Sequence, residues 1–406
     1  MFNAFRHWGV DGGSARVRLL GLMLAIVGAV AAAVALPRLP QDWHLKILAP
    51  GWMPHQLVKL IEYSNDLQVA LVADRPAEPH PRIALVLIGE ETLADLPYVS
   101  PIDRNLLARL VRAIDGLGAR AIGIDLLFDQ ATEPEKDRAF LTTLASRRAD
   151  IVLGGGDERT PMNPRRRAWQ DSFIDKAGKP FGFFNLRYDV REAEQSNVVR
   201  ARAAAQPDSR YARSFAEAVA ATVGTTAWPS SRRIPWLAPP RGGGDTFITL
   251  DADTILLAEA DPQGPLAHAI EAQLDGRIVL VGADLDGRDR HPTPLTLVTG
   301  EEMLGVAVHA QILAGLLDGR SIEDIGAVGH AVLGFVAAFL GVLAGWFAAR
   351  SRLVLSALIA TGVSLIIATS AITLWQSQEI VPLAALAATL AAGAVAGRFG
   401  RRWLGG

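Results

Sequence analysis

Long uncharged hydrophobic runs stand near both ends of the chain, and a region of mixed polarity lies between them. The first run covers residues 19–36, and three more cover residues 328–349, 353–374 and 380–396. A helix rises about 1.5 Å per residue, so runs of this length match the roughly 30 Å hydrocarbon core of a bilayer. The pattern predicts one membrane-spanning helix before the middle region and three after it.

The first run has a second interpretation. Ala33-Val34-Ala35 has the small-x-small pattern of a signal-peptide cleavage site. The uncharged run, however, is longer than the apolar core of a typical signal peptide. We therefore predict an uncleaved anchor at residues 19–36.

Basic residues in the short flanking segments predict the orientation of these helices. Arginines precede the first run, separate the second from the third and follow the fourth: Arg16, Arg18, Arg350, Arg352, Arg398, Arg401 and Arg402. Basic residues of short loops remain on the cytoplasmic side. Residues 1–18 and the tail 397–406 are therefore predicted to be cytoplasmic. Residues 37–327 are predicted to be extracytoplasmic.

Small residues recur at helical spacing in two of the late runs. They are Gly334, Ala338, Gly341 and Gly345 in one run, and Ala388, Ala392 and Ala396 in another. Small side chains allow helix backbones to approach closely in lipid. The pattern fits a packed bundle, a homo-oligomer face or a generic alanine-rich bilayer helix.

The middle region alternates between continuous apolar runs and amphipathic stretches. Residues 83–88 predict a buried strand, and residues 103–116 predict a helix that ends at glycine. A second buried strand follows at 119–128. Strand, helix and strand in this order predict a parallel pair, and hence an α/β domain with a mainly parallel sheet.

Later stretches extend this alternation. Residues 137–145 predict a helix, and residues 150–156 predict a third strand. The polar, arginine-rich residues 157–179 predict a surface loop. Further expected elements are two strands within 182–205, a helix within 209–224, a loop at 228–244, a fourth buried strand near 278–281 and a helix from 305.

Composition narrows the functional classes. Half of the 406 residues are hydrophobic, the net charge is −2, and there is no cysteine. A nearly neutral chain has no strong field to attract nucleic acid. The absence of cysteine excludes disulfides, thiolate metal sites and a cysteine nucleophile. The lipid bilayer is the one partner that composition itself indicates.

Three acids follow the fourth strand at close spacing: Asp284, Asp286 and Asp289. Their carboxylates are the hard oxygen ligands that Ca²⁺ or Mg²⁺ takes. The stretch lacks the glycine and the closing glutamate of an EF-hand loop, and acids in a glycine turn also cap and solvate backbone. We expect no cofactor here, with Ca²⁺ or Mg²⁺ as the alternative.

Candidate ligand-binding residues gather where the predicted strands end, the edge at which open α/β sheets bind ligands. They are Glu90, Arg104, Asp125, Asp129, Asp289, His291 and His309. Paired carboxylates could also serve as a general acid and base. The alternative is structural: Asp125 and Asp129 cap a turn, His309 is a half-buried helix residue, and Arg104 is a solvated arginine.

No sequence motif supports catalysis. The chain has no nucleophile elbow, P-loop, dinucleotide-binding fingerprint or HExxH motif. We therefore expect a protein that is not an enzyme. A periplasmic hydrolase is the last of the alternatives.

The middle region resembles the CHASE2 domain, an extracytoplasmic sensory module of bacterial transmembrane receptors. Four stretches carry the likeness: residues 83–93, 100–130, 182–200, and 276–295 with 305–320. The arrangement of one helix before the domain and three after it is also similar to that family. The chain departs from it where an acid usually follows the first strand, because Gly89 stands there and Glu90 comes next.

The resemblance implies a sensor of an unknown periplasmic ligand or protein. Receptors of this family usually continue into a cytoplasmic output domain, whereas this sequence ends at Gly406. We therefore expect the signal to pass to a separate membrane or cytoplasmic partner. The alternative is a non-catalytic accessory or scaffold subunit of a larger membrane complex.

Overall fold

The structure is a computed structural model that describes residues 55–191, 194–285, 287, 289–348 and 351–404. The chain divides into two compact units. Residues 73–322 form an α/β unit, and the segments before and after it form a helical unit. The predicted first span at 19–36 lies outside the described residues.

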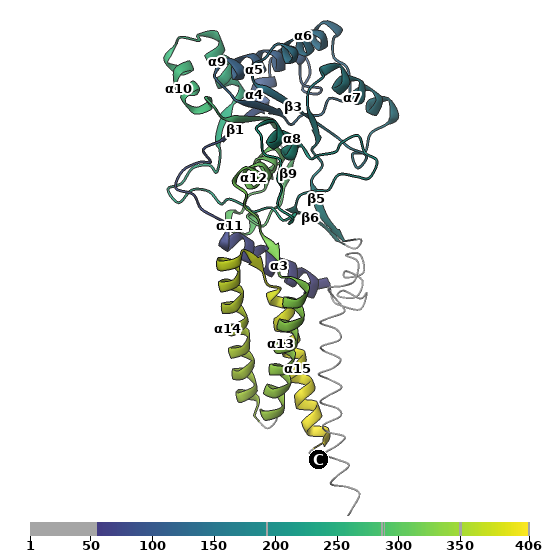
Figure 1. The fold of residues 1–406 in the computed structure, drawn as a ribbon, viewed down its shortest axis with the longest axis vertical. Helices are drawn as coiled ribbons and strands as arrows, with labels where there is room; N and C mark the ends of the chain where they lie inside the picture. The colour runs from purple at the N-terminus through teal and green to yellow at the C-terminus, as the bar shows by residue number, and fades with distance from the viewer. Residues whose placement is uncertain (1–54, 192–193, 286, 288, 349–350, 405–406) are drawn as a thin grey trace, which may run out of the picture. The chain divides into compact units, whose positions relative to one another are not determined.

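A six-stranded parallel sheet forms the centre of the α/β unit (Figure 1). The spatial order of the strands is β4-β3-β2-β8-β1-β7. Their bounds are β1 Ile83–Gly89, β2 Ala121–Ile124, β3 Asp150–Gly155, β4 Phe181–Phe183, β7 Ile248–Asp251 and β8 Ile278–Asp284. The predicted α/β class with a mainly parallel sheet is confirmed.

The predicted direct pairing of the first two strands is wrong. β8 lies between them, because Val279 is in register with Ala84 of β1 on one side and with Ile122 of β2 on the other. Both strands are still parallel to each other. The most apolar strand of the later sequence therefore takes the central position, where both of its faces are covered.

Helices cover both faces of the sheet. One layer contains α5 Arg104–Gly116, α6 Pro134–Ala145, α9 Ala252–Ala260 and α10 Pro265–Leu274. The other contains α8 Phe215–Thr222 and α12 Gly305–Asp318, which contact the sheet and each other. In β1, Ala84, Val86 and Ile88 face the first layer, as the two-residue period of a strand requires.

Residues 157–179 do not form the predicted surface loop, because α7 spans Pro164–Ala177. Asn163 caps its first turn, and Gly178 ends it in the left-handed region at φ 57°. Phe173 and Ala177 enter the main core. The helix is polar on most of its surface, so its apolar periodicity is weak and only its capping residues indicate it.

Shorter elements complete the α/β unit. β5 Arg187–Arg191 and β6 Glu194–Ala201 form an antiparallel hairpin, as predicted for this stretch. β9 Arg290–His291 pairs with β10 Met303–Leu304. The remaining helices are α4 Glu90–Leu93 and α11 Thr296–Thr299.

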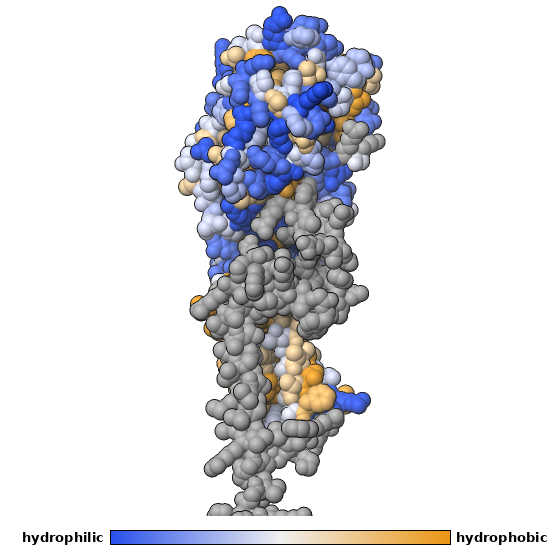
Figure 2. Space-filling model, turned by 90° about the vertical axis from the view of Figure 1, so that its right-hand side faces the viewer, coloured by the Kyte–Doolittle hydropathy of each residue, from blue (hydrophilic) through white to orange (hydrophobic). Residues whose placement is uncertain are grey.

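The helical unit holds three helices that are long and apolar enough to cross a membrane. They are α13 Ala327–Phe347, α14 Arg352–Ser377 and α15 Leu383–Leu404. The unit also contains α3 His55–Val72 and a short parallel pair, β11 Glu323–Asp324 with β12 Glu379–Ile380. Figure 2 shows hydrophobic residues on the visible part of this unit and a mostly hydrophilic surface on the α/β unit.

Glycines set the packing of α13 against α15. A Cβ added at Gly341 or Gly345 would overlap backbone atoms of α15, and one added at Gly393 or Gly397 would overlap backbone atoms of α13. The predicted stripe on α13 is therefore a packed helix–helix contact. On α15, Ala388, Ala392 and Ala396 are exposed, so this stripe takes no part in packing within the described bundle, and the homo-oligomer face and the generic bilayer helix stay open for it.

Candidate ligand-binding site

The carboxyl ends of β2 and β8 bring predicted site residues together. Asp125 follows β2 directly, and its backbone N–H donates to the Val281 carbonyl of β8 at 2.8 Å. The chain then turns after β8 and reaches Asp289, which adopts a left-handed backbone at φ 52°. The opening of α12 lies next to this turn, because Gly305 N–H donates to the Asp289 carbonyl at 2.9 Å.

Asp289 is fixed from two sides. His291 Nε2 lies 2.9 Å from Asp289 Oδ1, so the ring donates a hydrogen bond to the carboxylate. A Cβ at position 305 would overlap the Asp289 carboxyl group, so only glycine leaves room for it at the first residue of α12. The N-terminus of a helix favours a negative charge. The Asp289 carboxylate therefore occupies a position that suits an anion.

Asp125 lies in the opposite electrostatic situation. Protein atoms surround the carboxyl group of Asp125, although part of the residue is exposed to solvent. Among the described contacts no cation is paired with this carboxyl group. Burial raises its pKa well above the ordinary value, and the nearby charge of Asp289 raises it further. The charge of Asp289 therefore opposes ionisation of Asp125.

His309 of α12 adds a buried imidazole to this group. Its Nε2 lies 3.1 Å from the Phe184 carbonyl oxygen, and its ring packs edge-on against Phe215 at 5.3 Å between centroids. Burial lowers the pKa of His309 to about 4, so the ring is neutral at neutral pH. A carbonyl oxygen only accepts, so the hydrogen lies on Nε2 and Nδ1 has a free lone pair.

The Nδ1 atom of His309 is buried and has no hydrogen-bond partner among the described residues. The negative charge of Asp289 and the ring of His291 both act on His309 electrostatically. Asp125, Asp289, His291 and His309 therefore form one group, which we call the acidic cluster. It presents a carboxylate, a buried acid with a raised pKa and an unsatisfied acceptor.

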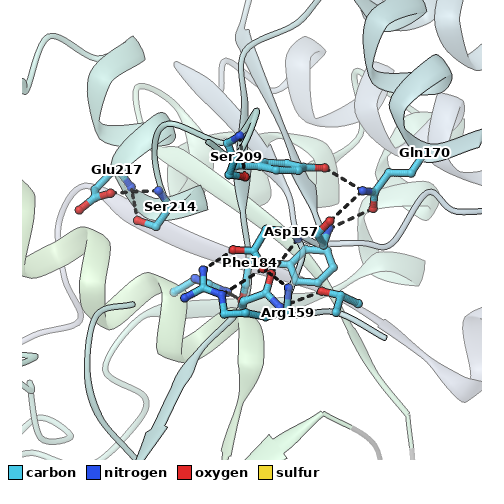
Figure 3. A network of polar contacts seen from close by, with 12 residues as sticks. Asp157, Arg159, Gln170, Phe184, Ser209, Ser214 and Glu217 are labelled. Carbon is cyan, nitrogen blue, oxygen red and sulfur yellow. Dashed lines mark hydrogen bonds and ion pairs between the residues drawn. The ribbon is translucent and has the colours of Figure 1, made fainter. Parts of the chain in front are cut away.

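A polar network supports the side of His309 that faces Phe184 (Figure 3). Phe184 N–H donates to the Gly155 carbonyl at 3.1 Å. In the adjoining loop Asp157 is fully buried and pairs with Arg159, whose guanidinium lies 4.7 Å above the Phe183 ring. These contacts fix the ends of β3 and β4.

Two more side chains fix the backbone of that loop. Gln170 Nε2 donates to the Gly156 carbonyl at 2.9 Å and to the Tyr211 hydroxyl at 2.8 Å. Arg167 donates to the Asp157 carbonyl at 2.7 Å and to the Thr160 carbonyl at 2.9 Å. The sequence pattern predicts a surface loop for residues 157–179, so it does not predict this network. The glycine run at 154–156 is the signal that could have located it.

Arg104 belongs to a different region. It is 1 % exposed, its guanidinium lies 4.8 Å from the Phe128 ring centroid, and its Nε lies 3.4 Å from Asp137 Oδ1. It also donates to the Ile102 carbonyl at 3.0 Å and to the Gln130 carbonyl at 3.3 Å. The structural alternative of a solvated arginine is wrong, because the side chain is buried and held by protein groups.

Two further predicted residues lie apart from the acidic cluster. Asp129 is buried and forms an ion pair with Arg166 of α7. Glu90 is exposed in the first turn of α4, at the end of β1. The structure therefore divides the predicted site residues into two sets. One set forms the acidic cluster, and the other, Glu90, Arg104 and Asp129, lies elsewhere in the α/β unit.

The candidate metal turn has no metal-like arrangement among the residues that the structure describes. Asp284 Oδ1 accepts from Arg290 at 2.6 Å, and Asp289 accepts from His291. No group of three or more potential metal ligands occurs within the described ranges. Asp286, the third predicted ligand, lies outside them.

A separate groove of about 490 Å³ lies along the edge strand β4. Phe181 lies in it, with Lys179, Arg210 and Arg213 around it. Arg210 is occupied by Asp171 at 2.9 Å and Asp175 at 2.6 Å. None of the predicted site residues lines this groove.

A membrane-associated α/β domain with an acidic cluster at its strand ends is the class of protein that fold and site define. The chain matches the CHASE2 domain over residues 41–349 and belongs to that family. CHASE2 domains are extracytoplasmic sensory domains. The comparisons with curated proteins and with solved structures found no match.

Proposed function

We propose that this chain is a receptor whose α/β unit binds a small ligand at the acidic cluster. Asp289 and His309 would accept hydrogen bonds from the ligand, Asp125 would exchange a proton with it, and His291 would orient Asp289. The observation that carries the proposal is the buried, unpaired Nδ1 of His309 near Asp289, whose charge also opposes ionisation of the buried Asp125. Unbalanced buried groups of this kind are typical of functional sites.

The chemistry of the cluster favours one class of ligand. Its free groups are acceptors, so a ligand rich in N–H or O–H donors, with a positive charge or none, would satisfy them. An anion would meet the Asp289 charge without a compensating cation in the cluster. Glu90, Arg104 and Asp129, which stand apart, are not included in this proposed site.

We further propose that the α/β unit faces the periplasm of a bacterium and that both chain ends are cytoplasmic. Arg352 at the start of α14 and Arg398 and Arg401 in α15 occupy the same end of the bundle, whereas Glu323 and Glu379 lie at the other. The positive-inside tendency supports this orientation. A ligand signal would then reach a separate membrane or cytoplasmic partner through the bundle, which requires two states that the ligand distinguishes energetically.

Thermal unfolding of the full chain in detergent tests the binding proposal. A panel of small amines and polyols is screened for compounds that raise the melting temperature, because a ligand that binds only the folded state stabilises it. Asp289→Ala and His309→Ala should remove the shift. Asp150→Ala, an exposed acid at the opposite end of the sheet, is the matched control and should retain it.

Two outcomes would contradict the receptor proposal. One is a ligand shift that survives both cluster variants. The other is co-purification of the chain in a stoichiometric membrane complex whose assembly fails without it and which responds to no compound in the panel. The second outcome would favour the scaffold alternative.

A further inference from the structure

Helix α3 has an unusual distribution of exposed residues. Leu60, Tyr63 and Leu71 are 55 %, 52 % and 70 % exposed. They are the only exposed side chains of α3 among those the structure describes, and each is apolar or aromatic. A water-facing helix shows charged and polar residues on its outer face instead. The outer face of α3 therefore differs from an ordinary solvent-exposed surface.

The three residues share one face of the helix. At about 100° per residue, positions 60, 63 and 71 fall within a sector of about 80°. The half-buried Leu67 lies in the same sector. The structure places this apolar face outward.

The opposite side of α3 packs within the helical unit. Val69 is buried there, and the buried Asp66 and Ala70 lie between it and the exposed sector. Ser370 Oγ of α14 donates a hydrogen bond to the Gln68 side chain. Figure 1 shows α3 lying across the ends of α13, α14 and α15.

The contact with Ser370 gives the depth of α3 along the bundle. Ser370 lies seven residues before the end of α14 at Ser377, which is about 10 Å of helix. α14 has 26 residues and is about 39 Å long, longer than a hydrocarbon core of roughly 30 Å. A helix held at this level lies close to the boundary between headgroups and acyl chains.

An aromatic residue marks the same level. Trp375, in the last turn of α14, is 76 % exposed. Trp and Tyr concentrate at membrane–water interfaces, where an apolar ring and a polar group are both accommodated. Trp375 on α14 and Tyr63 on α3 fit this distribution.

We propose that α3 is an interfacial helix that lies in the outer boundary of the bilayer, with Leu60, Tyr63 and Leu71 in contact with lipid. The neighbouring helices α13, α14 and α15 also expose large apolar side chains. Lipid therefore covers this face of α3 without any further protein. An interfacial helix typically inserts its apolar face about 5–10 Å into the headgroup and acyl boundary.

Site-directed spin labelling of the full chain in phosphatidylethanolamine–phosphatidylglycerol liposomes tests the proposal. The chain has no cysteine, so each variant carries a single label. Leu60→Cys, Tyr63→Cys and Leu71→Cys are compared with two controls. Arg148→Cys reports water on the α/β unit, and Leu365→Cys reports lipid in the middle of α14.

We expect collision rates with oxygen to exceed those with a water-soluble nickel complex at all three α3 positions. Their ratio should lie several-fold above that of Arg148→Cys and below that of Leu365→Cys. A ratio equal to that of Arg148→Cys would place α3 in water and overturn the proposal. Protection from both reagents would place the face against protein, either a second copy or a partner, and would also overturn it.

Discussion

Two regions of the α/β unit contain buried ionisable groups, and they differ in whether those groups have partners. Around Arg104 each charge has a partner: Arg104 contacts Asp137, and Lys136 Nζ contacts Asp103 at 2.6 Å and Glu133 at 2.9 Å. In the acidic cluster Asp125 has no cation among the described contacts, and one imidazole nitrogen of His309 is unsatisfied.

The pKa directions follow from this difference. Burial alone would raise the pKa of Asp103, but hydrogen bonds from Lys136 and from two backbone N–H groups lower it below its ordinary value. For Asp125 both burial and the neighbouring acid act in the same direction and raise the pKa. Balanced charge indicates a structural role, and unbalanced charge indicates a group retained for binding.

Replacement of Arg104 should have the largest effect on stability, because it removes one partner from the paired charges around Arg104, which we call the balanced region. Arg104→Ala should lower the free energy of unfolding by about 3–5 kcal/mol, since it leaves Asp137 unpaired and removes the contact with the Phe128 ring. Denaturant unfolding of the full chain measures this. The double variant Arg104→Met/Asp137→Asn should recover most of the loss, and a loss under 1 kcal/mol in Arg104→Ala would contradict the structural role.

The pH dependence of His309 should be the next largest effect. Its pKa is about 4 in the folded protein against an ordinary value of 6.5, so the unfolded chain takes up the proton first as the pH falls. His309 leaves the free energy of unfolding unchanged above pH 6.5 and lowers it progressively from pH 6.5 down to pH 4. At about 1.4 kcal/mol per pH unit, the loss reaches about 3 kcal/mol.

The variant His309→Gln isolates this contribution. Its amide can still donate to the Phe184 carbonyl, but it does not titrate. Melting temperatures measured across pH 4 to 7 should show a shallower slope for the variant than for the parent chain. Equal slopes would show that His309 is not the titrating group.

Replacement of Asp125 should stabilise the protein. Its raised pKa means that the unfolded chain releases the proton first as the pH rises above 3.8, so the parent chain loses stability toward neutral pH. Asp125→Asn should therefore gain about 0.5–2 kcal/mol at pH 7 and nothing near pH 4. A destabilised variant at pH 7 would show that Asp125 is a structural residue, and the proposed site would lose its proton-exchanging member.

Loss of the ion pair at the turn after β8 should have the smallest effect. Asp284 and Arg290 are both partly exposed, at 34 % and 43 % of their side chains. Exposed pairs contribute about 0–1 kcal/mol, so Arg290→Ala should change the melting temperature little. Calcium or magnesium should stabilise neither protein, and a metal-dependent rise would revive the metal alternative for this turn.

The strands and the acidic cluster could be predicted because each depends on a local signal. The continuous apolar run of β1 indicates a buried strand, and strand ends in a parallel sheet meet at one edge. Asp125 and Asp289 therefore lie near each other, and Asp289 lies near His309, whereas Asp129, expected at the same edge, pairs with Arg166 instead. The placement of β8 between β1 and β2 has no local signal, because it depends on competition among strands of similar composition.

The balanced region could not be predicted from Arg104 alone. Its burial depends on Phe128 and Phe173, which lie on segments far from it in the sequence. The alanine stripe of α15 stays out of the contact with α13 for a geometrical reason. Gly393 and Gly397, rather than Ala392 and Ala396, face α13, and a shift of one residue turns the contact face by about 100°.

The central position of β8 has a consequence for how the chain matures. β1 begins at Ile83 and β2 at Ala121, yet the strand that joins them begins only at Ile278. Until that late segment arrives, both early strands present unpaired edges, which are templates for aggregation. Such distant contacts also slow folding. A nascent chain would thus spend most of its synthesis as an incomplete sheet, and its yield should depend on chaperones that shield these edges.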